Sequence, residues 1–264
     1  MKWAWQLRVG LAAGMSFELL AGCGMSSQQV LSSVNIAQAG IAEVVVRDGS
    51  NSGLCSAVVV GAHTVLTAAH CVDQTPSSSI TVTAGSQATS PTSVSVHPDY
   101  LVPASDVTSS LSSGGADVAL LTFSQGGLVP SAYSLVWSVP SLNAGADVLG
   151  IGFGLNPDGT YGSLRSKMMQ FGSLATATAG SGSVFIDGFT LVERGSSGDL
   201  ICSGDSGGPL LMAQNNQPVV FGIAHEILTE SSSATTALQF CTSANAAAYT
   251  SLAPYAQWLS PQIY

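Results

Sequence analysis

A histidine, an aspartate and a serine in distinctive surroundings are the residues of this sequence best suited to chemistry. His70 ends the run Leu-Thr-Ala-Ala-His, Asp117 opens the apolar stretch Asp-Val-Ala-Leu-Leu, and Ser206 lies in the run Gly-Asp-Ser-Gly-Gly. A serine hydroxyl is a weak nucleophile at neutral pH, and it becomes effective where a histidine accepts its proton and a carboxylate orients that histidine. The residue types therefore predict Ser206 as the nucleophile, His70 as the general base and Asp117 as the orienting residue.

Many short β-prone segments, separated by Gly, Ser, Asn and Pro, must position these residues. Strands of this length and spacing are typical of an all-β sandwich or barrel. Residues 252–259 differ, because Pro254 lies near their start and apolar residues recur at helical spacing, which predicts a short C-terminal amphipathic helix. Residues 105–115 are rich in Ser and Gly and predict a surface loop. The predicted strands are residues 43–47, 57–60, 65–67, 80–84, 93–97, 118–123, 135–139, 147–151, 167–171, 183–186, 209–212, 219–225 and 246–249.

Residues 1–22 have the features of an export signal. Lys2 and Arg8 precede an apolar run at residues 9–20, which is too short to span a hydrocarbon core of about 30 Å as a helix. The run ends in Leu-Ala-Gly-Cys, which resembles the lipobox of bacterial lipoproteins, where the cysteine, here Cys23, becomes the lipid-bearing first residue. We expect a protein of the bacterial cell envelope, lipid-anchored or released; an ordinary secretory signal with a chance cysteine is the alternative.

The composition excludes one class of partner and indicates how the cysteines are used. Six Lys plus Arg against 15 Asp plus Glu give a net charge of −9, which leaves no basic stripe to neutralise a nucleic-acid backbone. Setting Cys23 aside as the lipidation site leaves an even number of cysteines, which should pair in an oxidising compartment; the spacing alone allows three connectivities. These cysteines are Cys55, Cys71, Cys202 and Cys241.

The sequence resembles the trypsin-like, chymotrypsin-fold serine proteases over about residues 40–264. The resemblance depends on the residues around His70 and Ser206, which match the family's two signature stretches, and on three smaller matches. The matching segments are residues 66–71, 96–100, 152–154, 204–210 and 249–250. The resemblance implies two antiparallel Greek-key β-barrels packed side by side, at about residues 41–130 and about 131–264, with the active site between them.

The same resemblance implies the disulfides Cys55–Cys71 and Cys202–Cys241. It implies a monomeric serine endopeptidase that acts on proteins or peptides through an acyl-enzyme, with no metal or organic cofactor. The backbone N–H groups of Gly204 and Ser206 are the implied donors to the oxyanion of the tetrahedral intermediate. Two alternatives are a catalytically silent homologue that serves as a binding module, and an esterase with the same triad.

The substrate pocket departs from the Arg- and Lys-specific pattern of the family. Leu200 lies where the base of the primary pocket is expected, and Ile227 and Ala247 are expected at its walls, so an apolar substrate side chain is favoured. His225 stands where the family usually has a serine that supports the catalytic aspartate. His225 is therefore expected to bond Asp117, to line the pocket and favour acidic side chains, or simply to fill a strand position.

Asp205 raises the question of activation. In the family, cleavage frees an N-terminal amine that pairs with the aspartate beside the nucleophile, yet this chain has no Ile-Val-Gly-Gly run and no Lys or Arg between Arg8 and Arg47. Residues 23–40, polar and small, predict a tether or pro-segment. One hypothesis is that cleavage within residues 28–36 both activates and releases the enzyme; the other is constitutive activity with Asp205 satisfied by the backbone or an internal cation.

The two remaining histidines outside the candidate site are expected to be structural. We expect His63 and His97 to be turn or surface residues.

Overall fold

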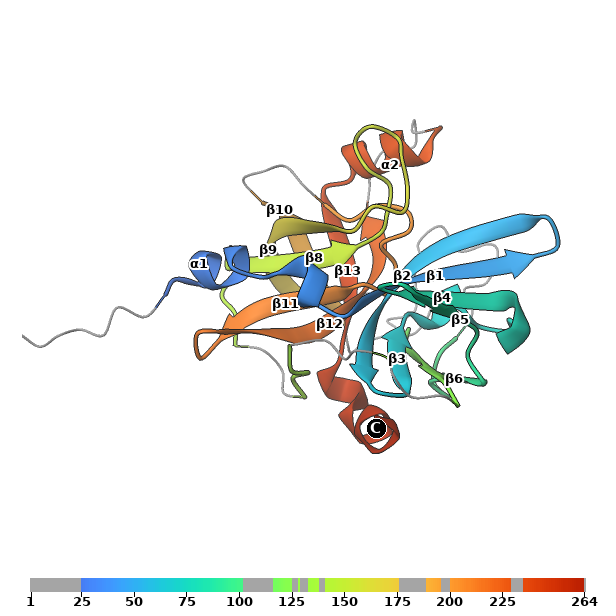
Figure 1. Cartoon of the computed structure of the whole chain (residues 1–264). Helices are drawn as coiled ribbons and strands as arrows, with labels where there is room; N and C mark the ends of the chain where they lie inside the picture. The colour runs from blue at the N-terminus through green and yellow to red at the C-terminus, as the bar shows by residue number, and fades with distance from the viewer. Residues whose placement is uncertain are drawn as a thin grey trace, which may run out of the picture.

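The computed structural model describes residues 25–101, 116–124, 128, 133–137, 141–175, 189–195, 200–228 and 235–263. Within them the chain folds into two antiparallel β structures with a few short helices (Figure 1). The all-β prediction with two barrel-like halves and a short C-terminal helix is confirmed. The export signal, Cys23, the loop at 105–115 and the strand predicted at 183–186 lie outside the described residues.

The first half is a seven-stranded sheet in the order β5-β4-β1-β2-β3-β7-β6. The apolar side chains of these strands point into a common core. β-branched residues suit such strands, and Val44, Val58 and Val65 are fully buried there. The strands are β1 (Ile41–Asp48), β2 (Asn51–Gly61), β3 (Thr64–Thr67), β4 (Ile80–Ala84), β5 (Gln87–Thr89), β6 (Ser93–Val96) and β7 (Ala119–Thr122).

The second half is a closed barrel in the order β10-β13-β12-β11-β8-β9. Closure leaves no unpaired edge, and the interior is filled by large side chains that include Met169, Phe221 and Tyr249. The strands are β8 (Asp147–Gly152), β9 (Arg165–Ala175), β10 (Phe189–Arg194), β11 (Pro209–Gln214), β12 (Gln217–Leu228) and β13 (Ala246–Ser251).

Sequence patterns located most strands but missed β5 and β10. Of the segment predicted at 135–139, residues 135–137 are described, and within them Leu135 forms an isolated bridge to Val220. β5 is three residues long and exposed throughout, so it has no apolar pattern. The predicted C-terminal helix is a helical stretch of three pieces, namely the 3-10 helices Ala253–Tyr255 and Ser260–Gln262 with α3 (Ala256–Leu259) between them.

Two helices were not expected. α2 (Ala237–Ser243) precedes β13 and carries Cys241. α1 (Ser27–Ser32), followed by a 3-10 helix at Ile36–Gln38, occupies most of the segment that we predicted to be a tether. Figure 1 shows α1 against the second half of the fold, where it contacts β8 and β11. The predicted tether is thus wrong for this part of the chain, which is folded onto the barrel.

Both predicted disulfides are confirmed. Cys55 bonds Cys71, joining β2 to the 3-10 helix at Ala69–Cys71, and Cys202 bonds Cys241, joining the segment before β11 to α2. Among the described helices, none has the length and apolar character needed to cross a bilayer.

Candidate active site

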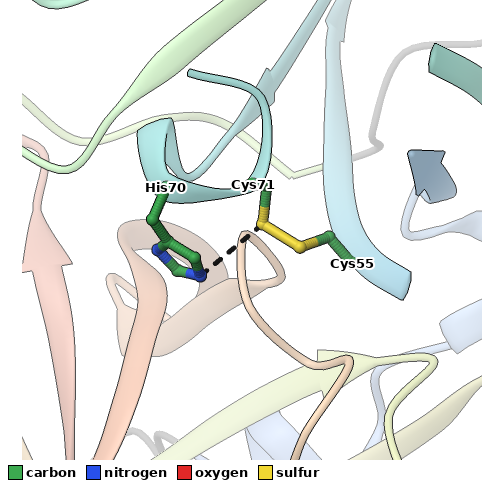
Figure 2. A group of neighbouring side chains, drawn as sticks. All are labelled: Cys55, His70 and Cys71. Atoms are coloured by element: carbon green, nitrogen blue, oxygen red, sulfur yellow. Dashed lines mark hydrogen bonds between the residues drawn. A yellow bond between two sulfur atoms is a disulfide. The ribbon is translucent and has the colours of Figure 1, made fainter. Parts of the chain in front are cut away.

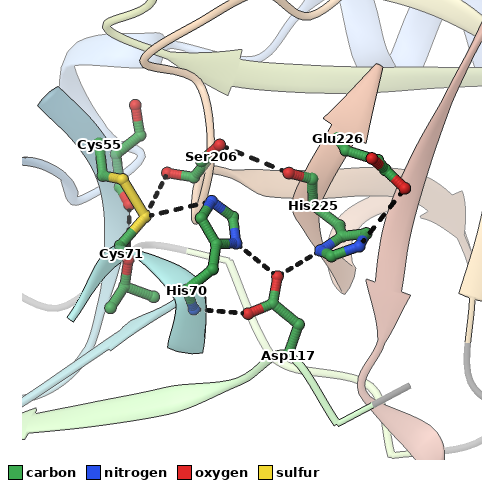
Figure 3. Close-up of polar contacts among 9 residues, drawn as sticks. Cys55, His70, Cys71, Asp117, Ser206, His225 and Glu226 are labelled. Atoms are coloured by element: carbon green, nitrogen blue, oxygen red, sulfur yellow. Dashed lines mark hydrogen bonds and ion pairs between the residues drawn. A yellow bond between two sulfur atoms is a disulfide. The ribbon is translucent and has the colours of Figure 1, made fainter. Parts of the chain in front are cut away.

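His70 and Asp117 face each other across the end of the first sheet. His70 lies in the 3-10 helix that follows β3, and Asp117 precedes β7, the strand paired with β3. The Asp117 carboxylate accepts two hydrogen bonds from the same residue, from the His70 backbone N–H at 2.8 Å and from Nδ1 of the ring at 2.7 Å (Figure 3). The two bonds fix the orientation of the imidazole and leave its Nε2 edge available.

His225, on β12 of the barrel, is the second imidazole on Asp117. Its Nδ1 hydrogen-bonds the same carboxylate oxygen, Oδ2, that accepts from His70. On its other side, His225 Nε2 lies 3.6 Å from Oε1 of Glu226. Of the three expected roles for His225, the structure contains the contact that supports Asp117 (Figure 3). This contact also joins the barrel to the first sheet.

Burial and charge set the protonation of this cluster. Burial raises the pKa of Asp117, yet the charge of His70 and the hydrogen bonds from His225 and His70 hold that pKa well below its usual value. Burial lowers the pKa of His70, but the Asp117 carboxylate and the charge of Glu226 outweigh it, so this pKa is raised above its usual value. Asp117 is thus an anion at any physiological pH, as an orienting carboxylate must be.

Ser206 lies in a tight turn between Cys202 and β11. Gly204 and Gly207 adopt φ values of +93° and +82°, which favour glycine. A Cβ on Gly207 would lie 2.2 Å from the Ser56 carbonyl oxygen, so the turn packs directly on β2. Two further bonds hold the turn there, from Ser56 Oγ to the Gly204 carbonyl at 2.9 Å and from the Ser56 N–H to the Ser206 carbonyl at 2.7 Å.

The backbone donors of this turn divide into two groups. The N–H groups of Asp205, Gly207 and Gly208 donate to carbonyl oxygens of Cys202, Ala224 and Asp205. Those of Gly204 and Ser206 donate to no acceptor in the described part of the chain. The two donors that the family resemblance implies for an oxyanion are therefore not used by the backbone hydrogen bonds that form the turn.

The Ser206 side chain lies close to the His70 ring. Its hydroxyl donates to the His225 carbonyl at 3.4 Å. Cys71 Sγ lies 3.7 Å from His70 Nε2 and 3.8 Å from the Ser206 carbonyl oxygen. Because one sulfur atom contacts both groups, the Nε2 edge of His70 lies near the Ser206 backbone (Figure 3). The hydroxyl is thus held by the His225 carbonyl on the barrel side, and catalytic hydrogen bonds commonly tighten only when substrate binds.

Two groups of potential metal ligands surround His70, and both are explained without a metal. In the first, Cys55 and Cys71 are joined by a disulfide beside the ring (Figure 2), so neither offers a thiolate. In the second, His70, Asp117 and His225 form the hydrogen-bonded cluster described above.

Asp205, the residue before Ser206, is paired with Lys167. Lys167 Nζ contacts Asp205 Oδ2, with the lysine side chain 6% exposed and that of the aspartate 2% exposed. Sequence analysis did not single out Lys167. The one available signal was its rarity, because Lys167 is the one lysine outside residues 1–22 and lies within a segment predicted to be a strand.

The predicted pocket residues lie in the barrel. Leu200 and Ala247 are buried in one hydrophobic cluster, and Ile227 packs against that cluster and faces Ala247 across the β12–β13 ladder. Leu200 also lines a small cavity that it shares with the cationic side chains of Arg165, Lys167 and Arg194.

The remaining histidines are structural. His63 lies in the β2–β3 turn, as expected, with Nδ1 at 3.0 Å from the Phe123 carbonyl oxygen. His97 is not a surface residue, because it is buried against the rings of Tyr255 and Trp258. The centroid of its ring lies 4.9 Å from the centroid of each of the other two.

Two packed β structures with a histidine, a buried aspartate and a Gly-Asp-Ser-Gly turn at their junction define the chymotrypsin-fold class of serine proteases. A family model described as Trypsin matches residues 34–259, and the chain belongs to the trypsin family. Comparison with curated proteins gave no match.

Solved structures share this fold at low sequence identity. An inactivated protease paralogue of the scabies mite matches with a TM-score of 0.62 and 19% identity, covering 87% of this chain and 96% of its own. Neuropsin, a serine protease of mouse brain, matches with a TM-score of 0.61 and 22% identity over the same shares. At these identities the likeness establishes the fold alone.

Proposed function

We propose that this chain is a serine endopeptidase in which Ser206, His70 and Asp117 act as the catalytic triad. The observation that carries the proposal is the coincidence of three features in one place: an imidazole oriented by a buried carboxylate, a serine beside its Nε2 edge, and two adjacent N–H groups with no acceptor in the described chain.

The proposed reaction follows from these positions. Ser206 Oγ attacks the carbonyl carbon of a peptide bond while His70 Nε2 takes the hydroxyl proton, and the resulting oxyanion accepts from the N–H groups of Gly204 and Ser206. His70 then returns the proton to the leaving amine, which gives an acyl-enzyme that water hydrolyses by the reverse sequence. Asp117 stays ionised throughout and stabilises the imidazolium form of His70.

His225 extends the triad as a positioning residue. By donating to Asp117 Oδ2 from the side opposite His70, it limits the carboxylate to one orientation. Leu200, Ile227 and Ala247 support a preference for an apolar side chain on the acyl side of the cleaved bond. We also propose that the chain is exported, with residues 1–22 as signal and Cys23 as a lipid anchor, since the two disulfides suit an oxidising compartment.

A library of peptide amides and matched esters, varied at that side chain, tests this function on the purified full chain. We expect cleavage of amides with apolar side chains, lost in Ser206→Ala by a factor on the order of a million in kcat. Ser203→Ala is the matched control, because it removes an exposed hydroxyl from the same turn, and its rate should equal that of the unmodified chain.

Each other outcome of the library has a definite meaning. Cleavage of esters without amides would make the chain an esterase, and absence of any cleavage by a folded chain would make it a silent homologue. A preference for acidic side chains would contradict the apolar pocket and assign the selectivity to the cations around Leu200.

A further inference from the structure

We propose that Lys167 is a positioning residue that holds the oxyanion turn in its working form, so that the chain needs no newly cut N-terminus to become active. This inference rests on the proposed peptidase function. It follows from the surroundings of Asp205, from the burial of Lys167 and from the way the N-terminal segment is folded.

Asp205 is a buried carboxylate at the centre of the turn. Oδ1 accepts from the Gly154 N–H at 2.9 Å, and Oδ2 accepts from the Cys202 N–H at 2.7 Å. The backbone of Asp205 also closes the turn, because its N–H donates to the Cys202 carbonyl and its carbonyl accepts from Gly208. Movement of this side chain would therefore move the peptide groups of Gly204 and Ser206 on either side.

Neutral donors alone do not compensate a buried anion fully, and Lys167 supplies the missing charge. A lone ionised carboxylate in a protein interior is strongly unfavourable unless a cation accompanies it. Lysine occurs in the sequence only at positions 2 and 167, so Lys167 is the one lysine of the described chain. Its Nζ contacts Asp205 Oδ2 on the core face of β9, where Met169 and Phe171 are its buried neighbours.

The β8 strand and the loop after it are shaped for this ion pair. A Cβ on Gly152 would lie 2.5 Å from Asp205 Oδ1, and one on Gly154 would lie 2.5 Å from Asp205 Cγ. The Gly-Phe-Gly segment thus leaves room for the carboxylate between β8 and the turn. The pair is enclosed by the fold rather than formed by a surface side chain that happens to reach it.

The N-terminal segment also argues against activation by cleavage. The hypothetical cleavage window at residues 28–36 contains most of α1, whose Val30 and Leu31 are 2% and 1% exposed. A capping box between Ser26 and Gln29 closes its first turn. A cut in this window would disturb buried side chains that pack on β8 and β11. Proteases cut most readily at exposed loops with few packing contacts, and this segment is not such a loop.

Acetylation of the native full chain tests the proposal without a mutation. Acetylation neutralises any free α-amine, whereas buried Lys167 should react only after unfolding, and mass mapping distinguishes the two sites. We expect molecules with an acetylated or uncut N-terminus to react with a fluorophosphonate probe as fast as untreated protein. A loss of labelling that follows α-amine acetylation, or labelling confined to molecules that begin within residues 28–41, would overturn the proposal.

Lys167→Met tests the ion pair itself. We expect the labelling rate and kcat to fall by about 10²–10³-fold, the cost of losing an oxyanion donor, with KM nearly unchanged. Lys167→Arg should recover part of the loss, since it restores the charge. Arg47→Met is the control, because it removes an exposed cation of β1 that bonds Thr81 and does not contact Asp205, and it should label at the normal rate.

The outcomes separate this inference from the proposed function. Full labelling of a folded Lys167→Met chain overturns the role of Lys167 and leaves the peptidase intact. Absence of labelling both in the uncut chain and in molecules that begin within residues 28–41 overturns the peptidase. Thermal unfolding of each variant shows whether it is folded, and if Lys167→Met does not fold, the acetylation experiment decides.

Discussion

At the scale of single residues, the site is distinguished by a carboxylate shared between two imidazoles. Asp117 is fully buried, and Oδ2 accepts from both His70 and His225 while Oδ1 binds the His70 backbone. Glu226 lies at the far side of His225. The order of groups is therefore carboxylate, imidazole, carboxylate, imidazole, from Glu226 through His225 and Asp117 to His70.

Glu226 is expected to tune the pH dependence of activity. His70 acts as a base only when neutral, so activity falls as the pH drops through its pKa, and the charge of Glu226 contributes to raising that pKa. Glu226→Gln should therefore shift the acidic limb of the kcat/KM profile to lower pH. Glu193→Gln, an exposed glutamate that does not contribute to the His70 shift, should leave the limb in place; a shift to higher pH in Glu226→Gln would contradict this reading.

Residue type and spacing indicated His70, Asp117 and Ser206. The family resemblance added both disulfide pairings and, as one of three alternatives for His225, a contact with Asp117. They did not predict Lys167 as the partner of Asp205. The reason is physical: the first group of residues sits in local sequence contexts that are themselves unusual, whereas the ion pair joins a lysine on β9 to a turn 38 positions later. Such a pairing depends on the barrel closing, which no local pattern records.

At the scale of elements, the short strands were predictable because they are apolar and bounded by turn residues. α1 was not, because it has few apolar residues and its stability comes from a capping box and from docking on β8 and β11. The residues around it, rich in Ser and Gln, have the composition of a tether.

The docking of α1 leads to a stability prediction. Leu31→Ala removes a side chain that is 1% exposed, and the free energy of unfolding should fall by about 2–5 kcal/mol. Denaturant unfolding followed by tryptophan fluorescence measures it. Gln28→Ala, on the exposed face of the same helix, should be close to neutral. Equal stability of the two variants would mean that residues 27–32 behave as the tether that composition suggests.

At the scale of the whole molecule, the site exists only where the two halves meet. The first sheet contributes His70 and Asp117, and the barrel contributes His225 and the turn with Ser206. Ser56 of β2 binds the turn directly, and Asp117 binds His225 across the junction. Activity should therefore require the complete fold, even though each motif is recognisable in the sequence.

Covalent labelling of the full chain with a fluorophosphonate probe, followed by peptide mapping, tests the central claim most directly. We predict a single adduct on Ser206 in the folded protein, absent in Ser206→Ala, strongly slowed in His70→Ala because the hydroxyl then has no base, and lost on unfolding. A folded chain that takes up no probe, or an adduct on a residue other than Ser206, would contradict the account.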